Sequence, residues 1–231
     1  MGADPPRSAP SPHTLHLRRT AVGGLYRTLA RLGVDAGDPS RHVALPPKTR
    51  RVARPLDDAE IALVRTAALA HRRWPQTAAA VAVAEATATT SEIARLAWTD
   101  LDLADGRVAL PGAPPIAART ATLSAWAAGT LARIAGHVDA DPAALLVYRG
   151  RADADSHAAQ AAVANLLRRL LVDAGVAAGD VKPSSIRLWA ARRALDDGAS
   201  VETVAVLLGL ASLDAAADAV GYHWQPKADP R

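Results

Sequence analysis

Basic side chains are the groups in this sequence whose type and spacing indicate chemistry. One cluster, Lys48, Arg50 and Arg51, lies in a proline-rich stretch, and a flexible basic segment of this kind can follow DNA through phosphate contacts. A second pair, Arg72 and Arg73, can bind a backbone phosphate, although an ordinary solvated surface explains it equally well. The sequence has no cysteine, which excludes disulfides, thiolate metal sites and cysteine nucleophiles. The chemistry indicated is phosphate recognition by charged hydrogen-bond donors.

The composition limits the classes of protein to which the chain can belong. Its 231 residues suit one domain, or one domain with an appendage. A net charge of +4 and a pI near 9.9 allow nucleic-acid binding. Abundant alanine and the absence of phenylalanine favour helices over a barrel or a sandwich. No apolar run approaches the roughly 18–20 residues of a membrane span, and no secretory signal is recognisable. We expect a cytoplasmic, mainly helical protein that has no membrane partner.

The chain divides into four predicted segments. Residues 1–13 hold little that could be buried and are expected to form a disordered tail. Residues 14–54 are predicted to form a helix, ending near Leu32, and then a basic, proline-rich linker. Residues 55–224 form the main domain, and residues 225–231 form a second tail.

Along the main domain, the spacing of the apolar residues changes from the period of a helix to that of a strand and then back to that of a helix. Asp57 and Glu60 are spaced as a capping box at the start of a helix, and Asp105-Gly106 lies between two apolar runs as in a hairpin. The pattern predicts an α+β fold, mostly helical, with a small antiparallel sheet of two or three strands between two sets of helices. The predicted helices are 57–69, 75–86, 91–100, 124–136, 156–175, 184–198, 201–208 and 213–220, and the apolar runs of the sheet are 101–103, 107–110 and 120–123.

Four segments, in order, resemble motifs of the tyrosine recombinase, or phage integrase, catalytic domain. Residues 89–102 are similar to Gly-Leu-Arg-x-Ser-Glu-x-x-x-Leu-x-Trp-x-Asp, and residues 119–124 to the strand that ends Arg-x-x-Pro-Leu. Residues 182–187 stand where the family has Pro-His-x-Leu-Arg, and residues 204–212 match Val-x-x-Leu-Leu-Gly-His-x-Ser. Each motif is weak alone, and the alternative is an unrelated alanine-rich helical protein. The resemblance implies the recombinase fold.

The resemblance also implies a set of catalytic groups, most of which this sequence lacks. Members of the family transfer a DNA phosphodiester to a tyrosine, using two arginines, further basic or aromatic donors and a hairpin lysine as general acid. Arg187 matches one catalytic arginine and Glu92 matches a supporting carboxylate. The other catalytic positions of the family hold different residues here. Thr89 stands for the first arginine, and Ser184 and Leu210 stand for two histidines. Ala219 lies near the expected position of the tyrosine, and residues 112–118, where the lysine is expected, contain none.

One tyrosine is left as a candidate nucleophile. Tyr222 lies three residues after the expected position, although we expect an aromatic anchor that packs on the core. Losing one donor to a developing oxyanion costs about 10²–10³ in rate, and here several groups are absent together. We therefore expect no catalysis.

The main domain also supplies candidate DNA contacts. Arg187 either binds a phosphate or is a structural arginine paired with Glu92 or an aspartate. Arg192 and Arg193 are adjacent and cannot share one narrow helix face. The candidates of this domain, besides Arg72 and Arg73, are Arg119, Lys182, Arg187, Arg192 and Arg193.

The sequence thus predicts a catalytically inactive, recombinase-like protein that binds double-stranded DNA on the nucleoid, with an architectural or regulatory role. One alternative is an active recombinase or integrase that uses Tyr222; another is a protein-interaction module derived from the fold. The resemblance implies an N-terminal half-clamp of which most is missing here, so a second copy or a protein partner is expected to supply it. No cofactor and no metal are expected.

Overall fold

The computed structural model describes residues 10, 12–34, 37–46, 53–137 and 141–222. The chain forms two compact units, Met1–Arg51 and Val52–Arg231, each of which is described by itself below. The linker residues Lys48, Arg50 and Arg51 and most of the two predicted tails lie outside the described residues. The four predicted segments therefore remain a prediction.

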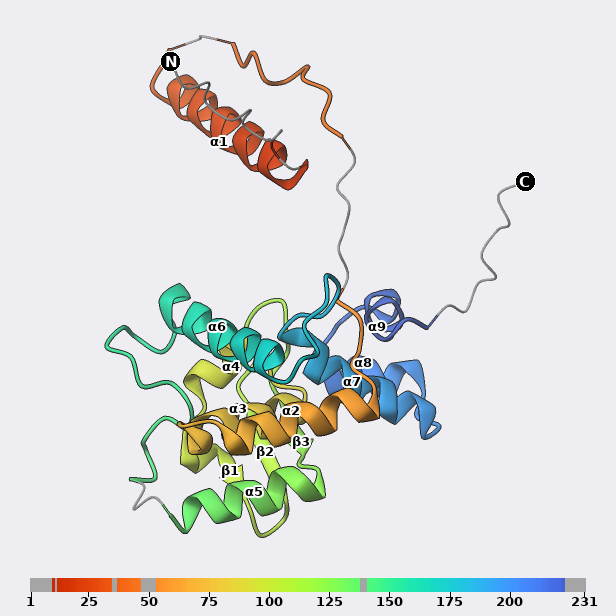
Figure 1. Ribbon diagram of the computed structural model, residues 1–231. Coiled ribbons are helices and arrows are strands. Elements are labelled where there is room, and N and C mark those ends of the chain that lie inside the picture. Colours follow the sequence, from red (N-terminus) through yellow and green to blue (C-terminus); the bar gives the residue numbers. More distant parts are fainter. Residues whose placement is uncertain (1–9, 11, 35–36, 47–52, 138–140, 223–231) are drawn as a thin grey trace, which may run out of the picture. The chain divides into compact units, whose positions relative to one another are not determined.

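The first unit is built on one long helix, α1 (Pro12–Arg31) (Figure 1). Gly33, with a φ of +81°, follows its last turn, as expected of a left-handed residue after a helix. The segment 37–46 is joined to α1 by the His16 ring, which lies 2.9 Å from the carbonyl of Pro46. Leu17 and Leu25 are 57% and 58% exposed, whereas Leu15 and Leu29 are partly buried, so part of the apolar side of this helix is uncovered.

In the second unit, local capping sets the start of the first helix. Asp57 accepts from the backbone N–H of Glu60 at 2.8 Å, and Glu60 accepts from the N–H of Asp57 at 3.0 Å. This capping box, predicted from the sequence, begins α2 (Asp58–Ala70). The box satisfies two backbone donors that the first turn leaves without helical partners.

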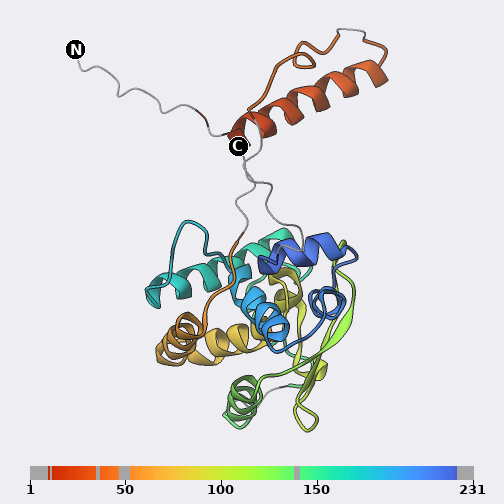
Figure 2. The same ribbon diagram turned by 90° about the vertical axis from the view of Figure 1, so that its right-hand side faces the viewer.

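The centre of the second unit is the alanine-rich helix α3 (Trp74–Glu85), which is buried on all sides from Thr77 to Glu85. Its small side chains let neighbouring helices approach its backbone closely. In both views, α5 (Ala125–Ala135) and α6 (His157–Asp173) lie on opposite sides of it (Figures 1 and 2). The short helix α4 (Thr90–Arg95) packs on α6 and α3.

A three-stranded antiparallel sheet interrupts the helices, as the change of period predicts. Its strands are β1 (Leu101–Asp102), β2 (Arg107–Leu110) and β3 (Arg119–Thr122), in the order β1-β2-β3. The 3₁₀ turn η1 (Trp98–Asp100) leads into β1. Val108 pairs with Ala121, and alternate residues of β2 are buried, so one face of the sheet covers the core. The α+β fold expectation is confirmed.

Three helices complete the unit around a smaller core: α7 (Ser184–Asp196), α8 (Val201–Leu208) and α9 (Leu213–Val220). Serine caps α5, α6, α8 and α9 through its side-chain oxygen, which explains why these helices begin close to their predicted starts. Within the described residues, no single helix is long and apolar enough to span a membrane; α8 and α9 meet the criteria only as a pair, and they are bent by 89°.

Candidate functional site

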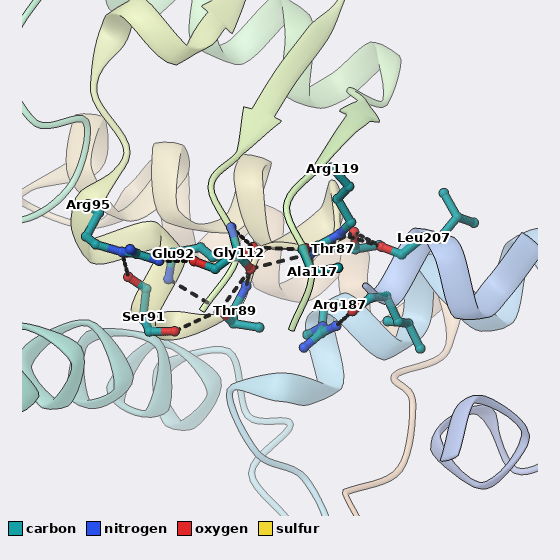
Figure 3. A network of polar contacts seen from close by, with 11 residues as sticks. Thr87, Thr89, Ser91, Glu92, Arg95, Gly112, Ala117, Arg119, Arg187 and Leu207 are labelled. Carbon is teal, nitrogen blue, oxygen red and sulfur yellow. Dashed lines mark hydrogen bonds and ion pairs between the residues drawn. The ribbon is translucent and has the colours of Figure 1, made fainter. Parts of the chain in front are cut away.

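Glu92 lies at the centre of a network that joins α4, the sheet and α8 (Figure 3). Its side chain is fully buried and forms an ion pair with Arg119 at 2.8 Å. The backbone N–H groups of Thr89 and Gly112 also donate to it, at 2.7 and 3.1 Å. Burial would raise the pKa of Glu92, but the hydrogen bonds from Thr89 and Arg119 outweigh it and lower the pKa below its usual value. Glu92 is therefore a buried anion.

The guanidinium group of Arg119 donates its hydrogen bonds to groups within the protein. Besides Glu92, it donates to the carbonyls of Leu207 at 2.8 Å, Thr87 at 2.6 Å and Ala117 at 3.1 Å. Only 6% of its side chain is exposed. DNA contact by Arg119 stays a prediction, but the geometry makes this residue a structural tie between β3, α4 and α8.

Arg187, on α7, lies beside this pair without joining it (Figure 3). It donates to the carbonyl of Leu208 at 2.7 Å, while its Nε is buried and has no partner among the described residues. Burial, and then repulsion by Arg119, lowers its pKa to about 10, against an opposing effect of Glu92. Of the two interpretations of Arg187, the structural one named Glu92 or an aspartate as its partner; Glu92 is paired with Arg119 instead. Arg187 itself pairs with no carboxylate of the described residues.

The loop between β2 and β3 closes against the end of α8. The N–H of Ala117 donates to the carbonyl of Gly209 at 2.9 Å. A Cβ on Gly209 would lie 2.8 Å from Cγ2 of Ile116, and Gly209 has a φ of +65°. Both facts require glycine here. In the family this loop carries the general acid, whereas here its apolar residues fill the space beside Gly209.

Thr89, at the position of the family's first arginine, is used as a helix cap. Its hydroxyl accepts from the N–H of Glu92 at 3.3 Å and donates to the Glu92 carboxylate at 2.8 Å. Thr87 holds a φ of +70°, which is unusual for a β-branched residue, and its hydroxyl donates to Leu207. The resembling motif begins Gly-Leu-Arg, and Thr89 stands for its arginine. Thr87 therefore stands for its glycine, which is the signal in the sequence for this conformation.

A cavity of about 400 Å³ lies next to Thr89. Arg95, the loop 113–116, and His157 and Gln160 of α6 also line it. Arg95 is paired there with Asp155 at 3.3 Å. Sequence reasoning missed Arg95 and His157, because nothing in the spacing of positions 95 and 157 shows that they meet.

The other predicted contacts on α7 lie away from this network. Arg192 forms a half-exposed ion pair with Asp196 at 2.9 Å. Arg193 lies 3.5 Å from Asp58 and over the ring of Trp189, 5.8 Å from its centroid. The backbone N–H of Lys182 donates to Ser185 at 3.0 Å. DNA contacts by Lys182, Arg192 and Arg193 stay predictions.

The remaining candidates are exposed. Arg72 and Arg73 lie in the turn between α2 and α3. Tyr222 follows Gly221 at the end of α9 and is 40% exposed. It belongs to neither apolar core, which does not fit the expected aromatic anchor. In the described part of the chain, its hydroxyl has no hydrogen-bond partner.

The described residues contain no group of three or more histidine, aspartate or glutamate side chains that could hold a metal ion. The candidate site is therefore built of guanidinium groups, one buried carboxylate and backbone amides.

Comparison with known proteins identifies the fold. Neither a protein-family model nor a curated protein matches the chain. Among solved structures, XerA recombinase is 18% identical with a TM-score of 0.56, over 92% of this chain and 73% of that one. A lambda integrase dimer bound to a COC′ core site is 18% identical with a TM-score of 0.66, over 95% of this chain and 63% of that one.

A third solved structure, the Tn1549 transposon integrase in complex with circular intermediate DNA, is 12% identical with a TM-score of 0.63. That match covers 93% of this chain and 76% of the integrase. The chain, with its helices and its three-stranded sheet, thus has the fold of the tyrosine recombinase and integrase catalytic domains.

Proposed function

We propose that this chain is a catalytically inactive DNA-binding protein of the recombinase fold. In this proposal it has an architectural or regulatory role on the nucleoid in the cytoplasm, and it contacts duplex DNA mainly through phosphates.

The observation that carries the proposal is the surroundings of Arg187. Arg187 is only partly buried and pairs with no carboxylate of the described residues, which supports its retention as a phosphate-binding group. The hydroxyl of Thr89 forms the hydrogen bonds of a helix cap, and the loop 112–118 has no lysine. A phosphate at Arg187 would meet one cation and no general acid, which supports binding without cleavage.

Two further facts support DNA as the partner. The chain has a net charge of +4, and similar solved structures are described as bound to a core site or in complex with circular intermediate DNA. Because the lambda integrase was solved as a dimer, we propose that a second copy or a protein partner completes the grip on DNA.

The binding experiment is fluorescence anisotropy with a labelled mixed-sequence duplex at 50 and 200 mM salt. We expect binding to weaken by about 10²-fold between the two conditions if about four phosphates are neutralised. No binding at 50 mM salt would contradict the proposal and favour the protein-interaction module. Sedimentation with and without the duplex then shows whether two copies assemble on it.

The cleavage experiment uses a nicked suicide substrate, which traps any covalent protein–DNA product. We expect no adduct from the unaltered chain. An adduct that disappears in Tyr222→Phe would contradict inactivity and establish the alternative, an active recombinase whose nucleophile is Tyr222.

A further inference from the structure

A second cavity, separate from the Arg187 site, has the chemistry of an anion-binding pocket. It has a volume of about 470 Å³ and lies between the turn that joins α2 to α3, the segment 147–150 and α6. Three arginines line it: Arg73, Arg149 and Arg169. None of its lining residues is an aspartate or a glutamate.

The three arginines are exposed and lack a carboxylate partner in the described part of the chain, whereas the more buried Arg65 and Arg119 each have one. Arg65 pairs with Glu85 at 2.7 Å and Arg119 pairs with Glu92 at 2.8 Å. No carboxylate of the described residues lies within 4.0 Å of the guanidinium groups of Arg73, Arg149 or Arg169. Three cations around one cavity repel each other, and a bound anion would offset that repulsion.

Side chains around the cavity are held in place by hydrogen bonds with the backbone. Gln76 donates to the carbonyl of Val147 at 3.0 Å, and Arg149 donates to the carbonyl of Tyr148 at 3.2 Å. The ring Nδ1 of His71 accepts from the N–H of Arg73 at 3.0 Å, so a neutral His71 carries its hydrogen on Nε2. The wall of the cavity therefore offers donors in addition to the arginines.

Gly150 makes room for the aromatic part of this wall. A Cβ on Gly150 would lie 2.2 Å from the hydroxyl oxygen of Tyr148, so any larger residue would displace that ring. The Tyr148 ring is 9% exposed, and its hydroxyl has no hydrogen-bond partner among the described residues.

The position of its lining residues on α6 separates this cavity from the cavity next to Thr89. Gln160 lines the cavity next to Thr89, whereas Arg169 lines the basic one. Nine residues apart, the two side chains lie half a turn from each other around the helix. The two cavities share no lining residue.

We propose that this basic cavity binds a small phosphate-bearing ligand of mononucleotide size. The guanidinium groups match a phosphate, and the volume falls within the roughly 300–1,000 Å³ of small-molecule sites. The amide oxygen of Gln76 and the hydroxyl of Tyr148, which have no hydrogen-bond partner among the described residues, are available to the rest of such a ligand. This ligand site goes beyond the proposed DNA binding and does not depend on it.

The test is isothermal titration of the full chain with inorganic phosphate, adenosine monophosphate and adenosine. Phosphate and adenosine monophosphate should compete for one site per chain, and adenosine should not bind. The double variant Arg73→Gln/Arg169→Gln should weaken binding at least about tenfold, because charge-assisted hydrogen bonds are lost. The control Arg72→Gln/Arg151→Gln removes the same charge from exposed residues outside the lining and should bind as the unaltered chain does.

A second variant acts by volume instead of charge. Ala162→Leu, on an exposed position of α6 that lines the cavity, should weaken binding of adenosine monophosphate without changing the fold.

Three results would overturn the proposal: no heat from either phosphate compound, equal binding of adenosine, or equal losses in the two double variants. Loss of duplex affinity in Arg73→Gln/Arg169→Gln, with no binding of adenosine monophosphate by the unaltered chain, would assign the arginines to the DNA surface instead. The duplex measurement is separate, so failure of one proposal is distinguishable from failure of the other.

Discussion

At the scale of single residues, the buried pair Glu92–Arg119 dominates the candidate site. A buried ion pair adds little net stability when both partners are present, but removing one partner leaves an uncompensated charge. Arg119 has the backbone carbonyls of Thr87, Ala117 and Leu207 as further acceptors, so it cannot leave the interior without breaking the contacts of three elements.

Glu92→Gln should lower the free energy of unfolding by about 3–5 kcal/mol, because it leaves the guanidinium of Arg119 buried beside a neutral group. Urea denaturation monitored by circular dichroism measures the change. Asp196→Asn breaks an exposed pair and should cost about 0.5 kcal/mol or less. Similar losses in the two variants would contradict a buried anion at position 92.

The pKa of Glu92 predicts how stability depends on pH. Because this pKa is lower in the folded chain than in the unfolded one, Glu92 stabilises the fold above the unfolded value of about 4.3. That contribution is lost as the pH falls through the folded pKa. Denaturation midpoints of the unaltered chain should fall in this acidic range more steeply than those of Glu92→Gln, and parallel curves would contradict the assignment.

Arg187 is the residue at which DNA binding is tested most directly. Arg187→Gln should weaken duplex binding at 50 mM salt and reduce the slope of log affinity against log salt by about 0.9, the value for one phosphate contact. Arg168→Gln, at an exposed position of α6 that is not a candidate DNA contact, is the comparison and should leave the slope unchanged. An unchanged salt slope in Arg187→Gln would show that Arg187 does not reach the phosphate backbone.

At the scale of elements, the contact between the β2–β3 loop and α8 decides how closed the site is. The loop lies against Gly209 through Ile116 and Ala117, and it has no lysine that would gain from facing DNA. Apolar packing therefore holds the loop where the family has a catalytic group.

Gly209→Ala and Gly221→Ala form a matched pair that measures this contact. Both glycines end helices with nearly the same backbone, φ +65° and +67°, so both variants lose about 1 kcal/mol or slightly more to left-handed strain. Only Gly209 faces the loop, since no atom of the described residues lies within 4 Å of a Cβ on Gly221. Urea denaturation should show a larger loss for Gly209→Ala, and equal losses would mean that the loop does not press on α8.

At the scale of the whole molecule, the chain is divided between a small unit and a large one. The larger unit holds both apolar cores. In the smaller unit, Leu17 and Leu25 of α1 are exposed. The larger unit therefore has the burial needed to fold alone.

A chain truncated to residues 52–231 should unfold in one cooperative transition at nearly the melting temperature of the intact chain. It should also lose about two to three units of salt slope on duplex DNA, because Lys48, Arg50 and Arg51 are removed. Calorimetry and anisotropy measure the two effects. An unchanged slope would contradict the prediction that the basic linker follows DNA.

Local sequence rules predicted most of the elements. The capping box of Asp57 and Glu60, the serine caps and the hairpin signal at Asp105-Gly106 depend on residues a few positions apart, so their effects are readable from the chain. The resemblance also assigned Glu92 and Arg187 to the catalytic site of the family, whereas Arg119 was predicted only as a candidate DNA contact. The boundaries of α2, α6 and α7 differ by a few residues, because helix ends depend on tertiary packing.

The partners of these residues were not readable in the same way. Which arginine neutralises Glu92, which carbonyls hold Arg119, and that Arg73, Arg149 and Arg169 line one cavity all depend on contacts between segments distant in sequence. The sequence by itself determined the helical character, the small sheet and the loss of the family's catalytic groups, because residue type and short spacing carry that information. Only the tertiary structure decided the pairing of charges, since a buried ion pair forms wherever folding brings opposite charges together and removes water from both.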